Sequence, residues 1–240
     1  MASSTGSSRA FPRLRPKLLA ALLGVICSAA SGRAGMPDYL REALGKMNAD
    51  VPAGWAYTLA TERNHEVSTT ERFDPTQPTG AQWTLLRYND RPPAAGELDK
   101  YVRYRAANPA VVSQATFQKA DVDPGSVTLV REDADRAEFT AAFRSESAGA
   151  DKMLAHLALG LVVNKRLAAL EKFTLDLREP YSPVLSVKMN ELHVEMAFTL
   201  PAGDRPGLPA VSTSHFVGRI FFFRTEENLH VTFTDYARSK

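Results

Sequence analysis

Polar and apolar residues alternate along residues 158–200, and this alternation constrains the fold more than any other feature of the sequence. The apolar positions of its two clearest segments are Phe173, Leu175 and Leu177, then Leu192, Val194, Met196, Phe198 and Leu200. A period of two residues is typical of a β-strand with one buried face. Between the segments, the prolines of residues 179–183 (EPYSP) interrupt the ladder because they lack an amide donor. The stretch therefore predicts the middle of a large antiparallel sheet.

Weaker alternation elsewhere predicts the remaining strands. They cover residues 54–62, 66–73, 82–88, 126–131, 136–143, 215–224 and 229–236, with Glu226-Glu227-Asn228 as the last turn. Residues 153–170 fit either a helix or a strand, but Gly160, the Val162-Val163 pair and the turn-like Asn164-Lys165 favour a strand and hairpin. The sum is about ten strands joined as sequential hairpins.

Two segments have helical spacing instead, residues 36–48 and 96–107. In the second, the aromatic and basic residues Tyr101, Arg103, Tyr104 and Arg105 point in several directions and predict a solvated face. A sheet this large twists and curls, so its apolar face should form a hollow that holds the helices. The expected class is α+β, mainly β: a large curved antiparallel sheet, an incomplete barrel, with a few helices covering its apolar face.

The first residues have the layout of a secretory signal peptide. Basic residues precede an apolar run at 18–30, which is too short to span a bilayer, and small residues flank Arg33. We expect cleavage after residue 34, a single half-barrel domain at residues 35–240, and a periplasmic or secreted protein that is not integral to the membrane. An uncleaved N-terminal anchor is the alternative.

Removing this segment changes the charge balance. The chain has 29 basic and 27 acidic residues, and residues 1–34 hold five basic and no acidic ones, which leaves 24 against 27, a formal charge of −3. An acidic domain with interspersed charges lacks the basic footprint of a nucleic-acid-binding protein. The only cysteine, Cys27, lies in the leader, so the remaining chain has neither disulfides nor thiolate chemistry.

Sequence motifs for chemistry are absent. The five histidines are scattered, without HExxH or a short His pair, and no GxSxG, P-loop or GxGxxG is present. In residues 212–215 (STSH), hydroxyls adjoin an imidazole, but neighbours on a strand point to opposite faces. We therefore expect no metal, no cofactor and no enzymatic activity. A hydrolase built from scattered His, Ser and Glu is the second alternative.

A ligand hypothesis follows from the one-sided apolar sheet, which has too few helices to cover it. The expected lining of the hollow is Phe173, Leu175, Leu177, Val194, Met196 and Phe198. Such a lining suits an acyl chain or another apolar ligand. The alternative is an envelope scaffold or interaction protein whose core is filled by its own helices. Residues 221–223 (FFF) indicate either a strand in the core with a covered outer face or a partner surface.

Several short motifs carry a resemblance over most of residues 35–240. They are RFDP at 72–75 with WTLL at 83–86, LVVNK at 161–165, EPYSP at 179–183 with Val187-Lys188, Gly218-Arg219, and FTDY at 233–236. The chain resembles a group of uncharacterised proteobacterial periplasmic proteins and, through them, the outer-membrane lipoprotein carrier and receptor superfamily of Gram-negative bacteria. The resemblance implies a half-barrel with an apolar pocket, no catalysis, and an acyl chain or lipoprotein as partner.

Overall fold

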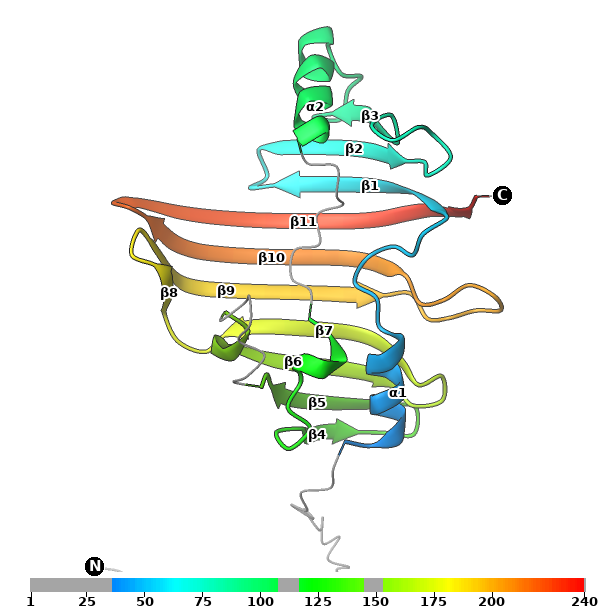
Figure 1. The fold of residues 1–240 in the computed structure, drawn as a ribbon, viewed down its shortest axis with the longest axis vertical. Coiled ribbons are helices and arrows are strands. Elements are labelled where there is room, and N and C mark those ends of the chain that lie inside the picture. The colour runs from blue at the N-terminus through cyan, green and yellow to red at the C-terminus, as the bar shows by residue number, and fades with distance from the viewer. Residues whose placement is uncertain (1–35, 108–116, 145–152, 240) are drawn as a thin grey trace, which may run out of the picture. The chain divides into compact units, whose positions relative to one another are not determined.

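An antiparallel sheet of eleven strands dominates the described part of the chain (Figure 1). The computed structural model describes residues 36–107, 117–144 and 153–239, all of which belong to one compact unit, Arg33–Lys240. The predicted leader, residues 1–34, lies outside the described residues.

The elements follow one another as hairpins with few interruptions. In chain order they are α1 (Asp38–Lys46), β1 (Trp55–Arg63), β2 (Val67–Phe73), β3 (Trp83–Tyr88), α2 (Ala95–Ala107), η1 (Lys119–Asp121), β4 (Thr128–Glu132), β5 (Arg136–Ala142), η2 (Leu154–His156), β6 (Leu157–Asn164), β7 (Ala169–Leu177), β8 (Tyr181–Val184), β9 (Val187–Phe198), β10 (Pro209–Ile220) and β11 (Phe223–Arg238). Residues 157–164 are thus a strand, as Gly160 and the valine pair indicated.

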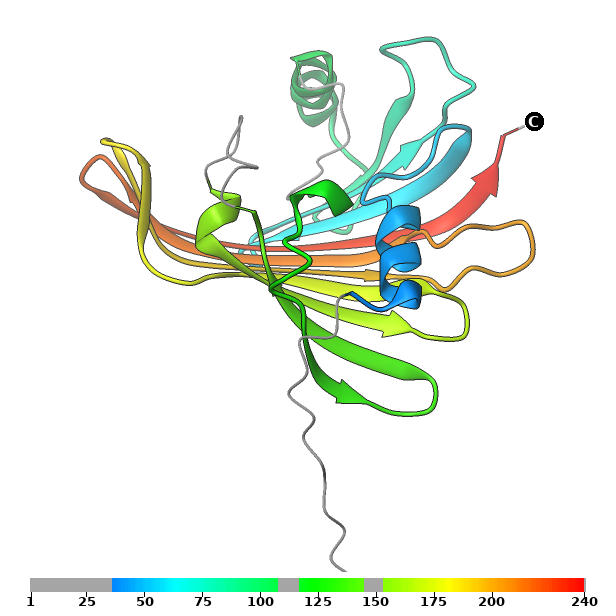
Figure 2. The same ribbon diagram turned by 60° about the horizontal axis from the view of Figure 1, so that its bottom comes forward.

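Pairing runs in the order β3-β2-β1-β11-β10-β9-β7-β6-β5-β4, with the short β8 paired only to β9. The sheet is strongly curved, and both helices lie on its concave side (Figure 2). Among the described residues β3 and β4 remain edge strands, so the sheet does not close into a barrel. The predicted class, a curved antiparallel sheet with a few helices, is confirmed.

The larger hydrophobic cluster, which we call the α1 core, fills the concave side over β5, β6, β7 and β9. Inward side chains of neighbouring strands stand in rows because the register pairs them directly, for example Leu161 with Phe173 and Phe173 with Met196. Helix α1 covers this cluster with Leu40, Ala43 and Leu44, each at most 2% exposed. The apolar stripe of α1 therefore seals this half of the concave face.

Replacing Ala43 with glycine should lower the free energy of unfolding by about 1 kcal/mol through helix propensity, and further because a buried methyl group is lost. Glu42→Gly is the matched control, since Glu42 is exposed on the same helix and carries the propensity cost plus an exposed ion pair with Lys46 that is worth about 0.5 kcal/mol at most. Urea unfolding of both variants measures the difference. Equal losses would show that α1 does not seal the core.

The final hairpin differs from the prediction. Its turn is the two-residue loop Phe221-Phe222, flanked by the Ile220–Phe223 pair, whereas residues 226–228 lie within β11. The polar residues 226–228 were predicted to form the turn, but they belong to the strand, where Glu227 Oε1 lies 3.6 Å from Arg63 Nε of β1. The apolar residues 221–223 were predicted to lie within a strand, yet they form the exposed end of the hairpin.

Candidate ligand-binding site

The six residues predicted to bind a ligand lie mainly inside the α1 core. Phe173, Leu175, Val194 and Met196 are at most 3% exposed and pack against other side chains of the protein, including the ring of Phe117, whose centroid is 5.1 Å from that of Phe173. Leu177 and Phe198 are half-buried at the border of this core, and Phe198 lines a cavity of about 440 Å³ beside the end of α1. The protein's own segments thus occupy the hollow over these strands.

A second hollow lies at the other half of the concave face, between α2 and strands β1, β2, β3 and β11. Its volume is about 560 Å³, within the range of small-molecule pockets. Six apolar residues contribute to its lining: Leu59, Val67, Leu85, Leu229, Val231 and Phe233. Its other lining residues are mostly polar or charged and include Thr61, Thr69, Tyr88 and Lys100. The cavity therefore combines an apolar floor with a polar rim.

The register of β1 explains why these residues share a face. Leu59 lies opposite Phe233 on β11 and opposite Glu71 on β2, and Thr61 lies opposite Val231 and Thr69. Alternate residues of each strand therefore point into the same hollow. The floor is continuous across the four strands because the residues paired in this register point to the same face of the sheet.

Helix α2 covers this floor almost without apolar burial. Arg105 is its one buried residue, and the apolar side chains Leu98 and Val102 are exposed. A helix that packs on a sheet normally buries an apolar stripe. Polar contacts must therefore hold α2 over the cavity.

The main such contact is the ion pair between Arg105 and Glu71, whose side chains are 7% and 9% exposed. The hydroxyl of Tyr101 also donates to Glu71 over 3.2 Å, and the Arg105 guanidinium carbon lies 3.9 Å from the centroid of the Trp83 ring. Burial and the negative charge of Glu71 raise the pKa of Tyr101. These side chains form a polar cluster at one end of the cavity.

Several buried donors within this cluster and beside it have no hydrogen-bond partner among the described residues. They are Arg105 Nε and Nη1, Trp83 Nε1 and the hydroxyl of Tyr57. The rings of Tyr57 and Trp83 are 5.9 Å apart, so these atoms belong to one neighbourhood. Buried polar groups are normally paired, and these four can all donate. Of these three residues only Arg105 lines the cavity, so its donors are the ones that suit an acceptor-rich group there.

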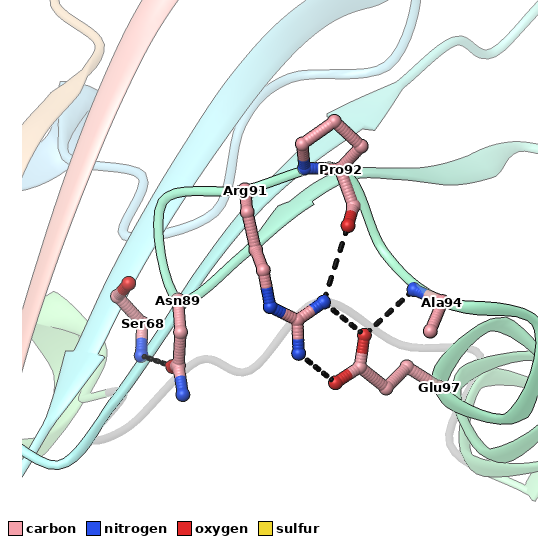
Figure 3. Close-up of polar contacts among 6 residues, drawn as sticks. All are labelled: Ser68, Asn89, Arg91, Pro92, Ala94 and Glu97. Carbon is pink, nitrogen blue, oxygen red and sulfur yellow. Dashed lines mark hydrogen bonds and ion pairs between the residues drawn. The ribbon is translucent and has the colours of Figure 1, made fainter.

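A second set of contacts fixes the start of α2 to the preceding turn (Figure 3). Arg91 donates two hydrogen bonds to the carboxylate of Glu97, over 2.9 and 2.6 Å, and the amide of Ala94 donates to the same group over 2.7 Å. The bonds from Arg91, then that from Ala94, hold the pKa of Glu97 below its ordinary value. Their stabilisation is present above the ordinary pKa of glutamate and is lost as the pH falls through the lower folded value.

Sequence reasoning missed this polar cluster. It interpreted the aromatic and basic residues of α2 as a solvated face, which holds for the exposed Arg103 and Tyr104. It is wrong for Arg105, which is buried, and for Tyr101, which is half-buried and donates to Glu71. One feature of the sequence could have revealed it. Glu71 lies between Thr69 and Phe73 on the face of its strand that points inward. A charge at an inward position requires a partner, and the helix supplies it.

The residues weighed for catalysis converge only in part: Thr213, Ser214 and His215 line a hollow of about 220 Å³ together with His65, His193 and His230. Ser212 is buried on the concave side, whereas His215 pairs with Asn228 across 2.8 Å between its Nδ1 and the Asn228 Oδ1. Within residues 36–107, 117–144 and 153–239, no group of three or more His, Cys, Asp or Glu side chains could hold a metal ion.

Comparisons with protein-family models, curated proteins and solved structures found no match to the chain. None of the helices that the structure describes has the length and apolarity needed to cross a membrane.

Proposed function

We propose that this is an exported, non-enzymatic protein that binds or carries an acyl chain or a similar apolar ligand in the cavity beneath α2. The observation that carries the proposal is a cavity of about 560 Å³ with an apolar floor, covered by a helix whose only buried side chain is that of an arginine. A helix held by an ion pair leaves apolar surface beneath it available, and burial of an acyl chain there stabilises the complex by roughly 0.8 kcal/mol per CH₂ group.

The polar end of the ligand is proposed to lie beside Arg105. Arg105 lines the cavity, and its unpartnered Nε and Nη1 favour a carboxylate or phosphate group, which has several acceptor oxygens. A fatty acid combines such a head group with a chain that fits the apolar floor. This arrangement moves the proposed site away from Phe173 and Met196, while keeping the class of ligand that the one-sided sheet predicted.

Replacing Thr69 with tryptophan tests the site, because Thr69 lines the cavity and a large ring there fills part of it. Uptake of a fluorescent fatty acid should weaken about ten-fold or more, which corresponds to about 1.4 kcal/mol. Thr70→Trp is the matched control, since Thr70 neighbours Thr69 on the strand but points to the opposite face. Fluorescence titration measures both affinities.

Equal uptake by the two tryptophan variants would place the ligand elsewhere. Wild-type protein that takes up no fatty acid, and that carries no lipid in native mass spectrometry after purification from cells, would contradict ligand binding altogether. The second candidate function would then remain: an envelope scaffold or interaction protein. It is favoured by the α1 core, which the protein's own Leu40, Leu44 and Phe117 fill.

A further inference from the structure

Two hairpins end side by side in an exposed apolar tip. The β8–β9 loop and the β10–β11 loop lie at the same end of the sheet in both views (Figures 1 and 2). The amide of Phe221 donates to the carbonyl of Ser186 over 2.6 Å, and Ile220 pairs with Val187. Six exposed residues make up what we call the apolar tip: Val184, Leu185, Ile220, Phe221, Phe222 and Phe223.

Folding does not account for these side chains. Leu185 and Phe222 are almost completely exposed, and Phe222 keeps 96% of its surface accessible. Phe221 has a φ of 55°, a left-handed conformation that is unfavourable for a bulky residue and is usually occupied by Gly, Asn or Asp in such turns. A two-residue hairpin loop with two phenylalanines is thus a poor turn sequence that also exposes apolar surface. Its presence indicates a role outside the fold.

Basic residues stand directly behind the tip. Lys188 of β9 pairs with Arg219 of β10, which pairs with Arg224 of β11, and all three are exposed. The segments 184–188 and 219–224 contain no acidic residue; Arg224 also contacts the exposed Glu226 across 3.4 Å. The chain outside the leader is acidic, so this concentration of positive charge is local. We call these three residues the basic collar.

We propose that the apolar tip and the basic collar form a peripheral anchor for an anionic lipid bilayer. Phenylalanine and leucine side chains enter the interfacial region, and the collar meets the phosphates, each cation raising the affinity for an anionic surface about five-fold. The narrow end of two hairpins suits insertion between head groups better than it suits a protein interface, which needs about 800 Å² on each partner. This inference is independent of the cavity beneath α2.

Vesicle co-sedimentation of the full-length protein tests the anchor. Wild type should bind vesicles containing phosphatidylglycerol much more tightly than vesicles of phosphatidylcholine alone. The variant Phe222→Ser/Phe223→Ser should bind anionic vesicles about ten-fold more weakly or worse, because two rings no longer leave water. Replacing each collar cation with glutamine should weaken binding roughly five-fold. All variants share the same N-terminus, so differences between them report the tip.

A matched control removes exposed apolar side chains at another place. Leu129→Ser/Val130→Ser on the edge strand β4 changes two exposed residues outside the tip and should leave vesicle binding unchanged. Phe221→Gly removes a ring while relieving the left-handed backbone, so it should weaken binding without lowering the thermal midpoint. That combination separates loss of the anchor from loss of the fold.

Equal binding by wild type and Phe222→Ser/Phe223→Ser would overturn the proposal, as would wild type that binds neither kind of vesicle. Equal binding to charged and neutral vesicles would also contradict it, because the collar would then contribute nothing. Sedimentation velocity tests whether a second copy of the chain binds the tip instead. If wild type is a dimer that binds no vesicles, and Phe222→Ser/Phe223→Ser is a monomer, the tip is a self-association surface.

Discussion

Replacing Phe173 with alanine is expected to lower the free energy of unfolding by about 3–5 kcal/mol. Phe173 is 1% exposed and its ring contacts the rings of Phe117 and Phe198, so truncation leaves a cavity in the centre of the α1 core. Fatty-acid binding by the folded fraction should change little, because Phe173 is separate from the residues that line the cavity beneath α2. Denaturant unfolding and fluorescence titration measure the two effects.

Phe222→Ala is the control for this substitution. It removes the same side chain at an exposed position and should change the free energy of unfolding by no more than about 0.5 kcal/mol. If Phe173→Ala instead loses little stability but much of its fatty-acid affinity, the result would favour the ligand site predicted from sequence. The substitution therefore discriminates between a core residue and a ligand-binding residue.

Replacing Arg105 with alanine is the second large change. Removing one partner of a buried ion pair typically costs about 3–5 kcal/mol, because the remaining charge is left without compensation. Here Glu71 regains water if α2 lifts from the sheet, so the effect should be concentrated in Ala95–Ala107. Hydrogen exchange of these amides should accelerate at least about ten-fold, with a smaller shift in the global unfolding midpoint. Fatty-acid affinity should also fall, since Arg105 is proposed to hold the polar end of the ligand.

Arg103→Ala is the matched control, because Arg103 is exposed on the same helix and should leave exchange unchanged. Adding Glu71→Gln to Arg105→Ala removes the uncompensated charge and should restore much of the protection of α2. Protection equal to that of wild type in Arg105→Ala would show that the ion pair does not hold the helix. The proposal of α2 as a cover anchored at one charged contact would then be wrong.

Local patterns made most of the fold predictable. Alternation at Phe173, Leu175 and Met196 identified inward faces because a strand with one buried side requires a period of two. The hairpin after β1 turns at Asn64-His65, and both residues have positive φ, which these polar residues tolerate better than β-branched ones. The last turn was not predictable in this way, because Phe221-Phe222 violates the usual turn chemistry.

The candidate site was less predictable, for a physical reason. Sequence alternation distinguishes inward from outward side chains, but it does not say which inward surface the helices occupy. Helix α1 fills the hollow over Phe173 and Val194, whereas α2 leaves the hollow over Leu59 and Phe233 largely open. The predicted lining residues therefore pack in the filled half.

By itself, the sequence determined the open curved sheet, because the period of two and the hairpin signals are local properties of the chain. Only the tertiary structure decided which half of the concave face keeps the larger cavity. That depends on the pairing of Glu71 with Arg105, residues 34 positions apart, which no local pattern specifies. The apolar tip was decided in the same way: the register of β10 with β11 moved the turn to Phe221 and exposed the rings.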